Sequence, residues 1–119
     1  MFKTTPLELF DEVAKVFRNF PKTEEEVKEF FVKLQRIFYA EAKNSIEMWQ
    51  IYQKSLTGNA TPNEINKANK IAQDLAISAG FIGLLALPGS LFFLPVLIKG
   101  AKEFGIDLVP ATIKEEFKI

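Results

Sequence analysis

Apolar residues in the first half of the chain recur at intervals of three and four, the spacing of one face of an α-helix. This spacing predicts a first helix over residues 6–20, with an apolar stripe of Leu7, Phe10, Val13, Phe17 and Phe20. A longer stripe predicts a second helix over residues 24–56, through Val27, Phe30, Phe31, Leu34, Phe38, Ser45, Trp49, Tyr52 and Leu56. No proline or glycine interrupts that second range. At about 1.5 Å per residue, it would be roughly 50 Å long.

The pattern changes in a third predicted helix, over residues 62–87. No charged side chain occurs between Asp74 and Lys99, and we call Leu75 to Ile98 the charge-free segment. A helix that is apolar on all sides is either deeply buried or in contact with lipid. Pro88 and Gly89 interrupt the segment, because proline inside a helix removes a hydrogen bond and clashes with the preceding turn. The segment is therefore predicted to form a helical hairpin, whose second arm is a fourth helix over residues 91–104.

Local chemistry marks where several of these helices begin and end. A threonine oxygen can accept a backbone N–H at a helix start, and a glutamate three residues later can return the bond. Such pairs begin at Thr5, Thr23, Thr61 and Thr112. Gly58 and Gly105 are predicted to end helices, because glycine readily adopts the left-handed conformation that follows a C-terminus.

Together the pattern predicts one all-α domain over residues 1–119, a bundle of about four helices with the apolar hairpin at its centre and a short C-terminal tail. The two arms of this hairpin need cover on every side, and only the first two helices are available to provide it. Two hypotheses supply the missing cover. Either the protein self-associates, or the hairpin contacts a membrane as a kinked span or a re-entrant loop.

Composition excludes several kinds of chemistry. The chain has no histidine and no cysteine, so thiol nucleophiles, thiolate metal sites and imidazole acid–base catalysis are all impossible. Its 15 basic and 15 acidic residues cancel, whereas proteins that bind nucleic acid usually carry a basic excess. We expect no catalytic residues, cofactor, metal, nucleic acid or small-molecule substrate. The acidic, weakly apolar start predicts a cytoplasmic or membrane-associated protein without a cleaved signal peptide.

Small residues suggest where another helix could approach closely. Ala72, Ala76 and Gly80 recur every four residues, as do Ala79 and Gly83. The candidate interaction or packing face consists of these small residues and of positions around the turn and the second arm: Ala72, Ala76, Ala79, Gly80, Gly83, Pro88, Gly89, Leu94 and Pro95. The expected partner is a second copy or another helical protein.

Asp74 lies where the third predicted helix loses its polar face. A carboxylate at the border of an apolar segment can bind a proton or a cation in a membrane pathway. The interpretation that the pattern favours is an ion pair with Lys70, one helical turn earlier. Both interpretations remain open from the sequence.

The stretch from Leu87 to Ile113 resembles the Letm family. The residues that carry the resemblance are Leu94, Pro95, Val96, Lys99, Phe104, Pro110 and Thr112, and Val109-Pro110-Ala111 stands where the family usually has leucine-proline-serine. Members of this family are mitochondrial inner-membrane proteins linked to cation–proton exchange and ribosome contact, and the family has shorter bacterial relatives. The resemblance implies membrane association.

The sequence therefore favours a small non-enzymatic helical protein that acts through its apolar hairpin, either at a membrane or as a subunit of a larger assembly. The alternative is a soluble interaction module that forms dimers.

Overall fold

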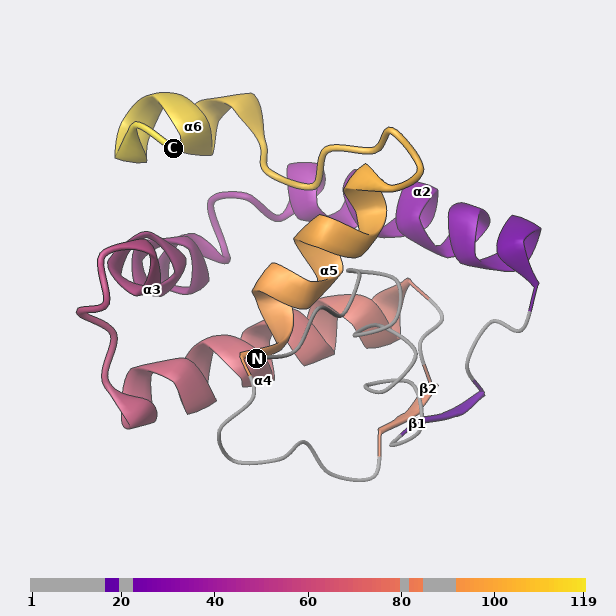
Figure 1. The fold of residues 1–119 in the computed structure, drawn as a ribbon, viewed down its shortest axis with the longest axis horizontal. Helices are drawn as coiled ribbons and strands as arrows, with labels where there is room; N and C mark the ends of the chain where they lie inside the picture. Colours follow the sequence, from indigo (N-terminus) through magenta and orange to yellow (C-terminus); the bar gives the residue numbers. More distant parts are fainter. Residues whose placement is uncertain (1–16, 20–22, 80–81, 85–91) are drawn as a thin grey trace, which may run out of the picture.

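The computed structural model describes residues 17–19, 23–79, 82–84 and 92–119. The predicted all-α class is confirmed, because helices dominate these residues (Figure 1). In chain order the elements are β1 (Phe17–Asn19), α2 (Glu24–Ala40), α3 (Ile46–Leu56), α4 (Pro62–Ser78), β2 (Ile82–Leu84), α5 (Phe93–Lys102) and α6 (Ala111–Phe117). The predicted C-terminal tail thus forms the short helix α6.

The prediction of one continuous helix over residues 24–56 is wrong, because this range forms two separate helices, α2 and α3. Side chains in the connecting turn compete for backbone groups, which weakens a helix locally. The Ser45 hydroxyl donates to the Glu41 carbonyl at 2.7 Å and shares this acceptor with the Ser45 backbone N–H at 2.9 Å. The Asn44 side-chain amide donates to the Glu41 carboxylate at 2.8 Å. Figure 1 shows α2 lying across the view and α3 almost end-on. The bend fits the chain into a longest dimension of 35 Å.

Two predicted helices were also too long at their ends. Residues 17–19 and 82–84, placed in helices from their spacing, instead form the antiparallel strands β1 and β2, with Phe17 opposite Leu84 and Asn19 opposite Ile82. Helix α4 ends at Ser78 because Gly80 and Gly83 follow, and each glycine costs a helix about 1 kcal/mol. The rest of the predicted helix over 6–20, its Thr5 cap and the turn at Leu87–Ser90 lie outside the described residues.

Most of the predicted caps are confirmed. Thr61 and Glu64 form a reciprocal capping box, with bonds of 3.2 and 3.0 Å. Thr23 accepts the Glu26 N–H at 3.1 Å, and Gly58 has a φ of +75° after α3. Thr112 is not a cap, because α6 starts one residue earlier. Pro110 is the N-cap residue instead, and its carbonyl accepts the backbone N–H groups of Ile113 and Lys114, each at 3.0 Å.

Helix α5 lies in the middle of the hydrophobic core. Figure 1 shows it (orange) between α2 and α4, and its apolar side chains share one buried cluster with residues of both helices. Its buried residues are Phe93, Leu94, Val96, Leu97, Ile98, Gly100 and Ala101. Lys99 and Lys102 remain exposed. The second arm of the predicted hairpin is therefore covered by the chain itself.

In the described parts of the chain, no helix combines the length and the apolar composition that a membrane span requires.

Candidate functional site

The small residues of α4 pack inside the protein. Ala72 and Ala76 are fully buried and Ala79 is 5% exposed. All three belong to the same core as α5, and α4 contacts both α2 and α5. Gly83, predicted on the same helical face, lies instead in β2. Gly80, Pro88 and Gly89 lie outside the described residues. The described part of the stripe thus brings helices of this chain together.

The α5 members of the predicted face point inward as well. Leu94 is fully buried and Pro95 is partly buried. Pro95 is the third residue of α5, a first-turn position where its missing N–H removes no helical bond. Pro95 therefore fits into α5 without needing to kink the helix. Of the residues that carry the Letm resemblance, Val96 and Pro110 are also buried, whereas Lys99 is exposed.

Sequence reasoning missed a polar contact that joins α4 to α5. The Oδ1 atom of Asn69 accepts the backbone N–H of Phe93 at 2.7 Å in a buried position. Phe93 is the first residue of α5, and Phe92, which precedes it, provides no side-chain cap. Asn69 therefore caps a helix that is distant in the sequence. One sequence feature could have indicated this contact: Asn69 is a polar residue beside Ala68 and Ala72 on an otherwise apolar stripe.

Asp74 is exposed on α4. Its backbone carbonyl accepts a hydrogen bond from the Ser78 hydroxyl at 3.1 Å. No ion pair joins it to Lys70, both residues being within the described range. No group of three acidic side chains able to hold a metal ion occurs in the part of the chain that the structure describes.

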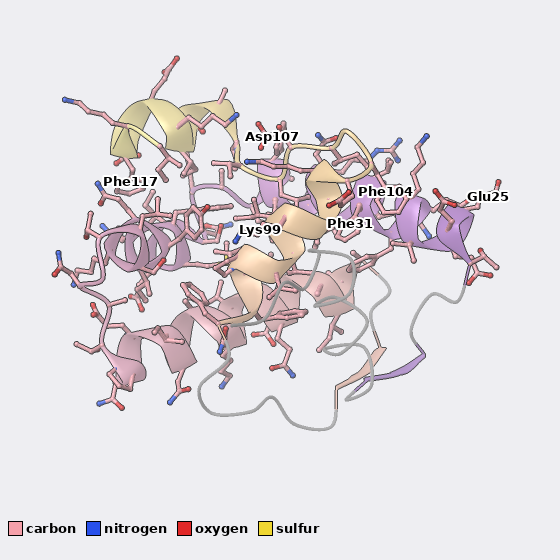
Figure 2. The ribbon with its side chains drawn as sticks, in the orientation of Figure 1. Glu25, Phe31, Lys99, Phe104, Asp107 and Phe117 are labelled. Carbon is pink, nitrogen blue, oxygen red and sulfur yellow. The ribbon has the colours of Figure 1, made fainter. Side chains whose placement is uncertain are left out.

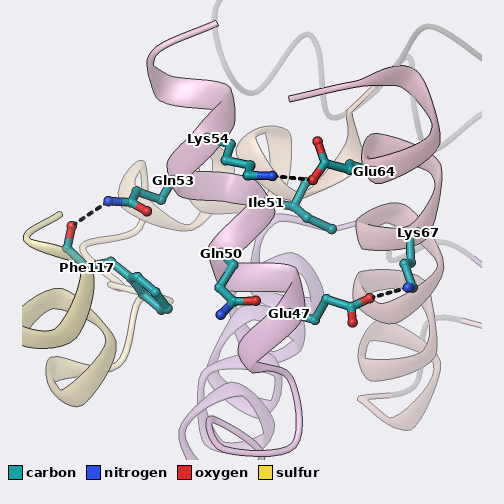
Figure 3. Close-up of a pocket in the computed structure, with 8 residues that line it drawn as sticks. All are labelled: Glu47, Gln50, Ile51, Gln53, Lys54, Glu64, Lys67 and Phe117. Carbon is teal, nitrogen blue, oxygen red and sulfur yellow. Dashed lines mark hydrogen bonds and ion pairs between the residues drawn. The ribbon is translucent and has the colours of Figure 1, made fainter. Parts of the chain in front are cut away.

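A polar groove between α3, α4 and α6 was not predicted. We call it the α3–α4–α6 groove (Figure 3), and its volume is about 530 Å³. Its lining residues are Glu47, Gln50, Ile51, Gln53, Lys54, Glu64, Lys67 and Phe117. The Gln53 side-chain amide donates to the Phe117 carbonyl at 3.3 Å, which holds α6 beside α3. Residues from three helices therefore form one concave surface.

Two ion pairs cross this groove from α3 to α4. Lys54 lies 2.6 Å from Glu64, and Lys67 lies 2.8 Å from Glu47. The hydrogen bond from Lys54, followed by that from the Thr61 backbone, lowers the pKa of Glu64. The hydrogen bond to Glu47 and its charge raise the pKa of Lys67. Both groups consequently remain charged at neutral pH.

A second polar cluster surrounds Asp107, in the segment between α5 and α6 (Figure 2). Its carbonyl accepts hydrogen bonds from Gln35 and Tyr39 of α2, each at 3.0 Å. Its carboxylate accepts the Val109 N–H at 3.0 Å and pairs with Lys114 of α6. Partial burial alone would raise the pKa of Asp107, but the bonds from Lys114 and Val109 outweigh it and lower the pKa. The cluster fastens the C-terminal segment to α2.

No family model, curated protein or solved structure matches this chain. The function must therefore be argued from the residues and their geometry.

Proposed function

We propose that this is a non-enzymatic helical protein that acts by association, through the end of α4 and the first arm of the charge-free segment. The proposed partner is a second copy of the chain. The observation that carries the proposal is the exposure of Ile77, whose side chain is 42% exposed on the last turn of α4. The residues that follow it up to Lys99 carry no charge.

The two described helices of the charge-free segment, the end of α4 and α5, differ in how they are covered. Helix α5 is enclosed by the core of the same chain, so it offers little surface to a partner. Among the described residues, the large exposed hydrophobic side chains are Tyr39, Leu56 and Ile77. Only Ile77 belongs to the charge-free segment. Single exposed apolar side chains are common on protein surfaces, so the proposal rests on the position of Ile77 inside the charge-free segment.

The resemblance to the Letm family is part of the proposal and suggests that the association takes place near a membrane. Leu94 and Val96, which contribute to the resemblance, are core residues here. Their packing role favours a contact made with protein by the other arm over one made with lipid by α5.

Light scattering after size exclusion tests the proposal across a range of protein concentrations. The wild-type chain should show a mass above that of the monomer, and Ile77→Lys should shift it toward the monomer. Burying an isoleucine contributes about 2 kcal/mol, so its loss should weaken association at least about tenfold. Asn66→Lys is the matched control, since it adds the same charge at another exposed position of α4.

Flotation with phosphatidylcholine–phosphatidylglycerol vesicles distinguishes the membrane alternative. A wild-type chain that is monomeric at every concentration and floats with the vesicles would refute protein association and favour membrane contact. Equal masses for wild type and Ile77→Lys would show that the end of α4 is not the interface.

A further inference from the structure

The α3–α4–α6 groove has the size of a small-ligand site. Ligand pockets typically enclose about 300–1,000 Å³, and this groove encloses about 530 Å³. Ile51 and Phe117 give it apolar lining, while the Gln50 amide offers both a donor and an acceptor (Figure 3). Its α4 residues, Glu64 and Lys67, lie in the first half of that helix, whereas Ile77 lies in the last turn.

The charges of the groove suit a ligand that carries both signs. Two lysines and two glutamates line it, so its net charge is zero and it favours neither a polyanion nor a metal cation. The side chains of the Lys54–Glu64 pair are 51% and 27% exposed, and those of the Lys67–Glu47 pair are 64% and 47% exposed. Ion pairs this exposed contribute little to folding stability. They can therefore exchange partners with a ligand without unfolding the protein.

The spacing of these charges sets the length of the ligand. Glu47 and Lys54 are two turns apart on α3, about 10 Å along the helix axis. Gln50 lies between them on the same helix and lines the same groove. An extended peptide spans about 3.3–3.6 Å per residue, so the terminal charges of a peptide of about three residues are separated by a matching distance.

We propose that the α3–α4–α6 groove binds a free peptide of about three residues with an apolar central side chain. The peptide ammonium group binds Glu47, and its terminal carboxylate binds Lys54. The Gln50 amide bonds to the peptide backbone between these ends. The central side chain packs mainly against Phe117, which is partly exposed, because Ile51 is only 3% exposed. Recognition thus requires both free termini of the peptide, which distinguishes this ligand from an internal segment of a protein.

Isothermal titration of the full chain with the tripeptide Ala-Phe-Ala tests this proposal. The same peptide, N-acetylated and C-amidated, is the ligand control, and it should bind at least about tenfold more weakly because it lacks both charged contacts. Amide-resolved NMR should show shifts concentrated at the side-chain amide of Gln50 and at the backbone of α3.

Charge-neutralising variants test the assigned contacts. Glu47→Gln and Lys54→Met should each weaken binding of the free peptide about five- to tenfold, as expected for one charge-assisted contact. Glu29→Gln and Lys33→Met, at exposed positions of α2, make the same chemical changes elsewhere and should leave binding unchanged. Far-ultraviolet circular dichroism confirms that each variant is folded. Equal affinity for the free and capped peptides, no binding at millimolar peptide, or equal losses in the α2 controls would overturn the proposal.

Discussion

The contact between Asn69 and Phe93 should be one of the most sensitive polar interactions in this fold. Replacing Asn69 with alanine takes the Oδ1 acceptor away from a buried backbone N–H, which it binds at 2.7 Å. A buried donor that loses its acceptor costs about 1–3 kcal/mol. The bond also caps α5, the helix at the centre of the core. We therefore expect Asn69→Ala to destabilise the whole fold.

Alanine also improves helix propensity, and this opposing effect must be removed. The gain is about 0.5 kcal/mol relative to asparagine. Asn66→Ala makes the same change at an exposed position of the same helix, and should be neutral or slightly stabilising. The difference between the two variants, about 1–3 kcal/mol, then measures the lost contact. For a chain of 119 residues it corresponds to a difference in Tm of about 4–12 °C.

Urea unfolding followed by circular dichroism provides the free energies. Asn69→Leu separates the lost bond from a cavity, since leucine restores side-chain volume but offers no acceptor. It should be destabilised about as much as Asn69→Ala. The reasoning fails if Asn69→Ala and Asn66→Ala have equal unfolding free energies, or if Asn69→Leu regains wild-type stability.

Two further predictions concern the ends of helices. The pKa of Asp107 is lowered in the folded state, so its carboxylate stabilises the fold above its unfolded pKa and loses that effect as the pH falls through the folded pKa. Asp107→Asn should therefore be less stable than wild type by about 1 kcal/mol or less at pH 7. The difference should shrink as the pH falls below the ordinary pKa of 3.8. Urea unfolding at pH 7 and at acidic pH checks this, and a difference that does not shrink with falling pH would contradict it. Gly58 has a φ of +75° and open space around its Cβ position, so Gly58→Ala should cost about 1 kcal/mol through backbone strain alone. Thermal unfolding measures that cost, and an unchanged Tm would show that the turn relaxes.

Features that depend only on residues close together in the sequence could be predicted. The Thr61 capping box and the left-handed Gly58 depend on neighbours within a few positions. The apolar stripe of α2 also matches its buried face. The break between α2 and α3 was missed because Ser45 continues the spacing of that face. Its buried hydroxyl binds the Glu41 carbonyl, which also accepts the Ser45 backbone N–H.

The candidate sites depend on residues that are distant in the sequence, which local patterns do not reveal. Glu47 meets Lys67 across two helices, and Phe117 reaches the same groove from a third. The two lysines and two glutamates of that groove cancel in charge, so the net charge of the chain does not indicate a charged site. Asp107 likewise contacts Gln35 and Tyr39 of α2 through its backbone carbonyl, an atom that every residue has.

The charge-free segment illustrates why uniform apolarity does not determine what covers a helix. Both arms carry no charge, yet α5 is enclosed by the core whereas the last turn of α4 exposes Ile77. The difference follows from the partners that each arm has. Asn69 fixes the start of α5 against α4, and the Asp107 cluster fastens the chain beyond α5 to α2. Because α5 is held at both ends, its apolar side chains are covered by this chain, and the proposed association relies on the exposed end of α4.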